Sequence, residues 1–304
     1  MGHVQPAAPP SQPAKLDEAR PSSKALLITA LVVAAIAISF AAVLFRAAPE
    51  LHPLSAAGWR LIIAGLVLTP FLRHLPRARA RIGLAGAAYA LHFGAWVASL
   101  GLLSVLVSTT IVTTTPLMLA AFALVTGRDR PHARALLGMA LGTCGVVLLA
   151  TSIPSDPATD NSLHGVLLAL IGAATGAVYL VTARSVRLPS MRASLAFSGA
   201  AALVGGVLLI TCALLVGAPM FPTSAAEAWV IIGAAALPQL VGHTLLTWAL
   251  TRTTPTTVAL ATLGEPIGAA LLAAALLGEP LTGLGVAACV LTLGGVALAL
   301  SDTR

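Results

Sequence analysis

Long apolar runs, separated by short polar segments, dominate the pattern of this chain after residue 24. One of them, "LTGLGVAACVLTLGGVALAL" at 281 to 300, holds 20 residues without a charge. As a helix such a run matches the ~30 Å hydrocarbon core of a bilayer. The pattern predicts an all-α polytopic membrane protein with ten transmembrane helices, at 25–46, 54–72, 82–101, 103–126, 135–152, 164–183, 193–217, 227–250, 255–277 and 281–300.

The composition supports this class, because 58% of the residues are hydrophobic and only 9% are charged, where soluble domains carry about 25% charged residues. Residues 1–24 are Pro-rich and polar, without a short apolar core before a cleavage site. They are therefore expected to be a disordered cytoplasmic tail. The three cysteines are too widely spaced to indicate a disulfide or a metal site, so no metal and no cofactor is predicted.

The net charge of +7 is distributed by topology. Fifteen of the 17 Lys and Arg residues fall in the termini and in the loops that ten helices place on the same side. Loops on the other side, such as "TSIPSDPATDNSLH", hold acids but neither Lys nor Arg. The positive-inside rule then predicts cytoplasmic N and C termini in a multi-pass protein of the cell (inner) membrane. No nucleic-acid partner is needed to explain the basicity.

The ten helices divide into two halves of five, at 25–152 and 164–301. Because five is odd, a duplicated unit must be inserted upside down, which predicts two inverted repeats. At an offset of about 150 residues, Pro116 in "TTTPLMLAAFAL" corresponds to Pro266 in "LGEPIGAALLAA". With one slip, "HFGAWVA" from His92 resembles "HTLLTWA" from His243.

The stretches "AAGWRLIIAGLVLTP", "VGHTLLTWAL" and "GEPIGAALLAAALLGEPLTGLGVAACVLTLGGVALA", with Pro-centred fourth and ninth helices, resemble the EamA-type transporters of the drug/metabolite transporter superfamily. The resemblance covers nearly the whole chain after residue 24. It implies a carrier of small solutes, commonly an exporter of amino acids or other metabolites. The first helix, "AIAISFAAVLF", lacks the membrane carboxylate of the related four-helix multidrug exporters, so their proton-exchange residue has no counterpart there.

An ionisable side chain at the centre of a membrane helix costs about 2.5 to 3.5 kcal/mol on insertion scales, so each one needs a partner, water or a task. Glu265 lies near mid-membrane beside Pro266, and both Pro116 and Pro266 are predicted to break their helices. Glu265 is either a substrate or proton site, or a structural group that satisfies the kinked backbone or pairs with Arg60. Arg60 in turn could extend outward, pair with Glu265, or bind a substrate carboxylate.

Further candidates for substrate binding or coupling follow from helical spacing. On the third helix Tyr89, His92 and Trp96 share one face, at i, i+3 and i+7, and on the eighth helix Gln239 and His243 align at i+4. Each histidine is either a coupling group or a neutral imidazole bonded between helices. The hydroxyls of Thr113 and Thr114 either line a cavity or return to their own backbone.

Glu279 belongs to the second Gly-Glu-Pro tripeptide of the chain, in the predicted turn between the last two helices. A solvated carboxylate costs little in such a turn, and Pro280 suits the start of a helix. Glu279 is therefore expected to be structural only.

These features favour a secondary transporter, most simply an exporter of amino acids or related amines, working by alternating access around a midplane cavity. Its expected partners are a small-molecule substrate, membrane lipid and protons as a coupling ion, with no nucleotide, because the chain has no Gly-x-x-x-x-Gly-Lys-Ser/Thr loop. An uptake carrier in the same fold is one alternative. Another is an intramembrane enzyme using His92, His243 and Glu265, against which stands the lack of a hydrolase or metalloprotease motif. A non-enzyme is predicted.

Overall fold

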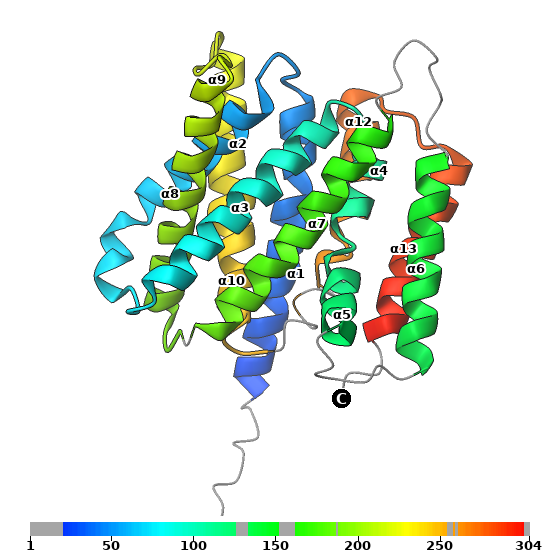
Figure 1. Ribbon diagram of the computed structural model, residues 1–304, viewed down its shortest axis with the longest axis horizontal. Helices are drawn as coiled ribbons and strands as arrows, with labels where there is room; N and C mark the ends of the chain where they lie inside the picture. Colours follow the sequence, from blue (N-terminus) through cyan, green and yellow to red (C-terminus); the bar gives the residue numbers. More distant parts are fainter. Residues whose placement is uncertain are drawn as a thin grey trace, which may run out of the picture.

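The first and last described residues, Pro21 and Leu300, lie at the same end of a helical bundle, as the computed structural model shows in Figure 1. The structure describes residues 21–125, 133–151, 162–186, 188–253, 258 and 261–300, and within these ranges it holds helices and no strand. We call the end with Pro21 and Leu300 the terminal end and the opposite one the distal end. The expected tail at 1–24 lies mostly outside the described residues.

The elements follow one another as two sets. The first comprises α1 (Pro21–Arg46), α2 (Pro53–Val67), the 3-10 helix η1 (Thr69–His74), α3 (Arg79–Leu100), α4 (Val105–Val112), α5 (Thr115–Val125) and α6 (Ala133–Thr151). The second comprises α7 (Ser162–Ser185), α8 (Met191–Leu215), α9 (Ala225–Ala234), the π-helix η2 (Ala235–His243), α10 (Thr244–Ala249), α12 (Glu265–Leu277) and α13 (Gly283–Leu300). The leading helices α1 and α7 run in opposite directions (Figure 1).

Five helices of the described chain are long and apolar enough to cross a bilayer: Lys24–Arg46, Arg79–Leu100, Leu163–Ser185, Met191–Leu215 and Ala225–Ala249. Other apolar helices are shorter, among them α2, α12 and α13. The multi-pass helical class is thus confirmed. The count of ten spans and the side on which the termini lie stay predictions.

The predicted helix 54–72 changes to the 3-10 helix η1 after α2 ends at Val67, and the predicted helices 103–126 and 255–277 are also not continuous. α4 ends at Val112 and α5 begins at Thr115, while α12 begins at Glu265 after a turn at 263–264. Pro116 and Pro266 are each the second residue of the new helix. Proline has no N–H to donate and crowds the preceding turn, so it fits the first turn of a helix better than the interior. The break therefore falls before each proline, and the two restarts lie 150 residues apart.

The predicted regular helix at 227–250 is also wrong in detail, because its middle third is the π-helix η2. Pro238 lies inside that segment. A proline removes one backbone hydrogen bond and crowds the carbonyl four residues earlier, which accounts for a locally wider winding. Gln239 and His243, which bracket its second half, are thereby presented differently from two residues on an ordinary α-helix.

Small residues bring the helices close together. α6 packs along α13, α3 along α7, and α2 along α8, whereas α1 contacts both η2 and α12. A Cβ atom added at Gly295 of α13 would collide with the backbone of Gly142 on α6. In a bilayer, where lipid is as apolar as leucine, such close backbone packing is a main source of helix association.

Candidate functional site

A cavity of about 80 Å³ lies between the two sets of helices, bounded by α1, α3, α4, α5, α7, η2, α10 and α12. It has room for several water molecules. Six residues predicted from the sequence line it: Tyr89, His92, Trp96, Thr113, His243 and Glu265. The other three predicted residues, Arg60, Gln239 and Thr114, do not belong to its wall.

Two half-helix starts meet at the cavity. Thr115 and Glu265, the first residues of α5 and α12, both line it. The N-terminus of a helix carries partial positive charge and unpaired amides, so a carboxylate is favoured there. The Thr115 hydroxyl is engaged, donating to the carbonyls of Val112 at 3.0 Å and Ala173 at 3.1 Å. The Glu265 carboxylate forms no hydrogen bond or ion pair with any part of the chain that the structure describes.

The two histidines face each other across the cavity, with ring centroids 6.5 Å apart. His92 Nδ1 lies 2.7 Å from the carbonyl oxygen of Gly172 on α7, and since a carbonyl only accepts, Nδ1 must carry the proton. His92 thus has the predicted interhelical bond and also lines the cavity. The His243 ring meets Phe93 edge-on at 5.0 Å, and its nitrogens form no hydrogen bond to the described residues.

Aromatic rings build much of the remaining wall. Tyr89 stacks on Tyr179 with centroids 3.8 Å apart, and the Tyr179 hydroxyl lies 2.9 Å from Thr247 Oγ1. The indole nitrogen of Trp96 is buried without a hydrogen-bond partner in the described structure. The cavity is therefore apolar and aromatic, with a few polar groups that are not all satisfied from within.

Arg60 lies behind this wall and is fully buried. Its Nε donates to Gln239 Oε1 over 3.1 Å, and its guanidinium carbon lies 4.2 Å from the centroid of the Phe93 ring. Both terminal nitrogens have no hydrogen-bond partner among the described residues. Burial excludes an outward extension, and no direct ion pair to Glu265 is formed. Arg60 is instead a cation held by Gln239 and separated from the cavity by one aromatic ring.

The threonine hydroxyls return to their own backbone, as one of the two readings of the sequence expects. Thr113 Oγ1 donates to the Thr109 carbonyl over 2.9 Å, and Thr114 Oγ1 donates to the Ile111 carbonyl over 2.7 Å. Each of these carbonyls also accepts a backbone N–H, from Thr113 and Thr114 respectively. Thr113 still lines the cavity, whereas Thr114 does not.

Some lining residues are absent from the predicted site. Phe93 and Thr247 belong to the wall. Phe93 has no polar or ionisable group by which the sequence could have indicated it, although it neighbours His92. Thr247 lies one helical turn from His243, at i+4, so helical spacing would have been enough to predict it.

Together these features define a multi-pass helical membrane protein with an aromatic and partly charged cavity between two sets of helices. The chain belongs to the EamA-like transporter family, which matches residues 25–151 and 163–301 as two repeats. Members of this family are small-molecule transporters of the drug/metabolite transporter superfamily, in accord with the predicted non-enzyme.

Comparison with known proteins provides independent support for the fold. No curated protein matches the chain. A solved structure described as "Crystal structure of protein" is similar at 19% sequence identity and a TM-score of 0.63, covering 91% of this chain and 96% of its own. At that identity the likeness establishes a shared fold and nothing about the substrate.

Proposed function

We propose that this protein is a secondary transporter that exports amino acids or related amines by alternating access around the cavity between its repeats. The observation that carries the proposal is the position of Glu265. Its carboxylate is unpaired within the described chain, lines the cavity, and begins a half-helix at the junction of the two repeats. Broken helices at such a junction are where secondary transporters hold substrate and coupling ions.

The chemistry of the wall suits a zwitterion. Glu265 offers a partner for an ammonium group, while the start of α5 and the cation of Arg60 behind Phe93 favour a carboxylate. The rings of Tyr89 and Trp96 suit an apolar side chain. The cavity volume of about 80 Å³ is well below that of ordinary ligand pockets, which is about 300 to 1,000 Å³. Substrate binding therefore requires a wider conformation.

Protons are the proposed coupling ion. Glu265, His92 and His243 bring a carboxyl group and two imidazoles to the wall, and the two imidazoles are close enough for one or two waters to connect them. Return of a proton through this cavity would drive substrate the other way. An uptake carrier would use the same groups, so the direction must be measured.

Purified protein in liposomes tests the proposal. Labelled amino acids and amines loaded inside should exchange with unlabelled substrate outside. Glu265→Gln should reduce the exchange by tenfold or more, because an amide provides no charge for an ammonium group. The matched control is Glu50→Gln, which removes an exposed carboxylate outside the cavity. If folded wild-type protein moves no amino acid or amine, or converts a lipid or peptide instead, the proposal is wrong.

The direction of transport can be measured in cells. Metabolites inside and outside cells are compared with and without the protein. Export predicts depletion inside and accumulation outside of the same compound. The opposite shift would establish the uptake carrier.

A further inference from the structure

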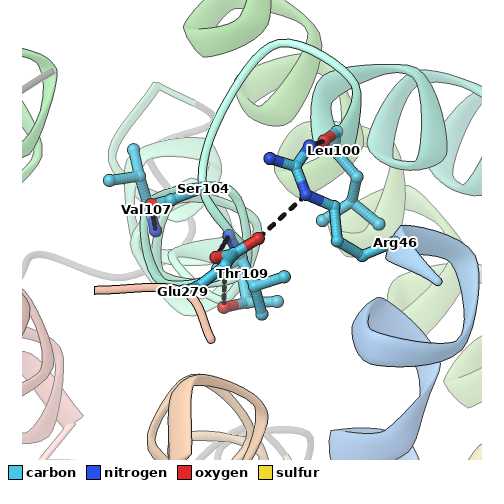
Figure 2. Close-up of polar contacts among 7 residues, drawn as sticks. Arg46, Leu100, Ser104, Val107, Thr109 and Glu279 are labelled. Carbon is cyan, nitrogen blue, oxygen red and sulfur yellow. Dashed lines mark hydrogen bonds and ion pairs between the residues drawn. The ribbon is translucent and has the colours of Figure 1, made fainter. Parts of the chain in front are cut away.

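Glu279 connects three segments at the distal end of the bundle, as Figure 2 shows. Its Oε1 lies 2.8 Å from Arg46 Nε, and its Oε2 accepts the backbone N–H of Val105 over 2.9 Å. Arg46 Nη1 donates in turn to the Leu100 carbonyl over 2.6 Å. We call Arg46, Leu100, Val105 and Glu279 the distal latch. The expectation of a solvated Glu279 is wrong, because its side chain is only 16% exposed.

Each charged side chain of the distal latch contacts a helix end of opposite partial charge. Leu100 is the last residue of α3, where carbonyls are unpaired and the partial charge is negative, so a guanidinium is favoured. Val105 is the first residue of α4, where amides are unpaired and a carboxylate is favoured. One arginine and one glutamate thus hold both sides of the α3–α4 connection. They also join α1 of the first repeat to the α12–α13 turn of the second.

The helices joined by the latch are also helices that line the cavity. Along α1, Arg46 follows the lining residue Ile38 by eight positions, or about 12 Å. Leu100 follows the lining residue Trp96 by four positions, or about 6 Å. The latch therefore lies between the cavity and the distal face.

A related contact exists at the opposite end. Arg184, near the end of α7, donates from Nη1 to the Leu250 carbonyl after α10, also over 2.6 Å. α7 leads the second repeat as α1 leads the first, so the two arginines occupy comparable places at opposite ends. In the described part of the chain Arg184 has no acidic partner. Among the residues that the structure describes, the two ends are thus held by similar contacts, and only the distal contact includes a carboxylate.

We propose that the distal latch is the gate between the cavity and the distal face, and that its opening requires Glu279 to release both Arg46 and the Val105 amide. The inference rests on the proposed alternating access and adds the contact that controls one side of it. The Arg46 side chain is 36% exposed. A partly exposed ion pair contributes little net free energy, so this contact can close the bundle and still open in each transport cycle.

Accessibility of the cavity tests the gate without any substrate. Val112→Cys places a thiol in the cavity wall, in a background where Cys144, Cys212 and Cys289 are alanine. A membrane-impermeant maleimide is added to intact cells and, separately, to inverted vesicles. Marker cysteines at the exposed position 50, near the distal end, and at position 77, near the terminal end, identify which preparation presents the distal face.

Glu279→Gln should raise the labelling rate of this thiol from the distal face by about threefold or more, because the amide keeps an acceptor for Val105 but loses the charge for Arg46. Glu50→Gln, which removes an acid from the same end without breaking a contact of the latch, should leave the rate unchanged. Equal labelling of Glu279→Gln and the parent, in protein that elutes as a single folded species, would overturn the proposal.

A charge swap separates the ion pair from mere loss of folding. Arg46→Glu and Glu279→Arg should each increase labelling, and their combination should lower it again. The recovery should be partial, since arginine cannot accept the Val105 amide. A double variant that labels as fast as the singles would overturn the ion pair as gate. Because labelling needs no transport, the latch and the proposed substrate can fail independently.

Discussion

Replacing Arg60 and Gln239, singly and together, tests how a guanidinium is kept inside this bundle. Arg60 is fully buried, donates one hydrogen bond of 3.1 Å to Gln239, and lies 4.2 Å from the Phe93 ring centroid. Burial of the charge costs about 2.5 to 3.5 kcal/mol on insertion scales. A hydrogen bond to a charged group returns about 1.5 to 3 kcal/mol, and a desolvated cation–π contact about 2 kcal/mol.

The cost of burying the charge and the free energy returned by its contacts are similar in size. The effect of each single variant should therefore depend on which polar group it leaves without a hydrogen-bond partner. Arg60→Met removes the charge but orphans the buried Gln239 amide, and should lower the free energy of unfolding by about 1 to 3 kcal/mol. Gln239→Met deprives the guanidinium of its hydrogen-bond partner and should cost about 1.5 to 3 kcal/mol. The double variant leaves neither group orphaned. Its loss should be smaller than the sum of the single losses by about 1 to 3 kcal/mol.

The free energies of unfolding would be measured by denaturant titration in mixed detergent micelles. Strictly additive losses would refute the reasoning, because they would mean that Arg60 and Gln239 do not depend on each other. Transport by the double variant adds a second result. A stable double variant without transport would assign the cation a part in carboxylate recognition.

Three further predictions concern the cavity and the packing. Glu265→Gln should flatten the dependence of transport on pH, measured as flux across a pH series, since an amide exchanges no proton; an unchanged profile would remove Glu265 from coupling. His243→Phe should lower flux at least severalfold with unchanged thermal stability, because the ring nitrogens have no hydrogen bond in the described chain; full activity would exclude His243. Gly295→Ala should lower the unfolding temperature, as its Cβ would collide with Gly142, whereas Gly294→Ala, which meets no atom within 4 Å, should not.

The hydrophobic pattern predicted the helical membrane class, the resemblance of particular stretches indicated the family, and the 150-residue offset predicted where the two broken helices correspond. The restarts at Thr115 and Glu265 follow from local chemistry, because proline belongs in a first turn. The wider winding around Pro238 was missed, since a proline within an apolar run does not say whether the helix will kink, break or widen.

Contacts between segments that are distant in the chain could not be predicted from the sequence. Arg60 and Gln239 are separated by 179 positions, and Val105 and Glu279 by 174. Helical spacing relates residues within one turn or two, and it carries no information about which helices become neighbours. The sequence therefore predicted a solvated Glu279, although its carboxylate oxygens bind Arg46 and the Val105 amide, which lie far away in the sequence.

The N-termini of α5 and α12 have a consequence for the orientation of the proposed substrate. Two equivalent half-helix starts would accept a dipolar solute either way round. With threonine at one start and glutamate at the other, only one arrangement places an ammonium group against a carboxylate. For the proposed amino-acid substrate, this one side-chain difference between the two repeats sets a single preferred orientation, and exchanging Thr115 with Glu265 should reverse it.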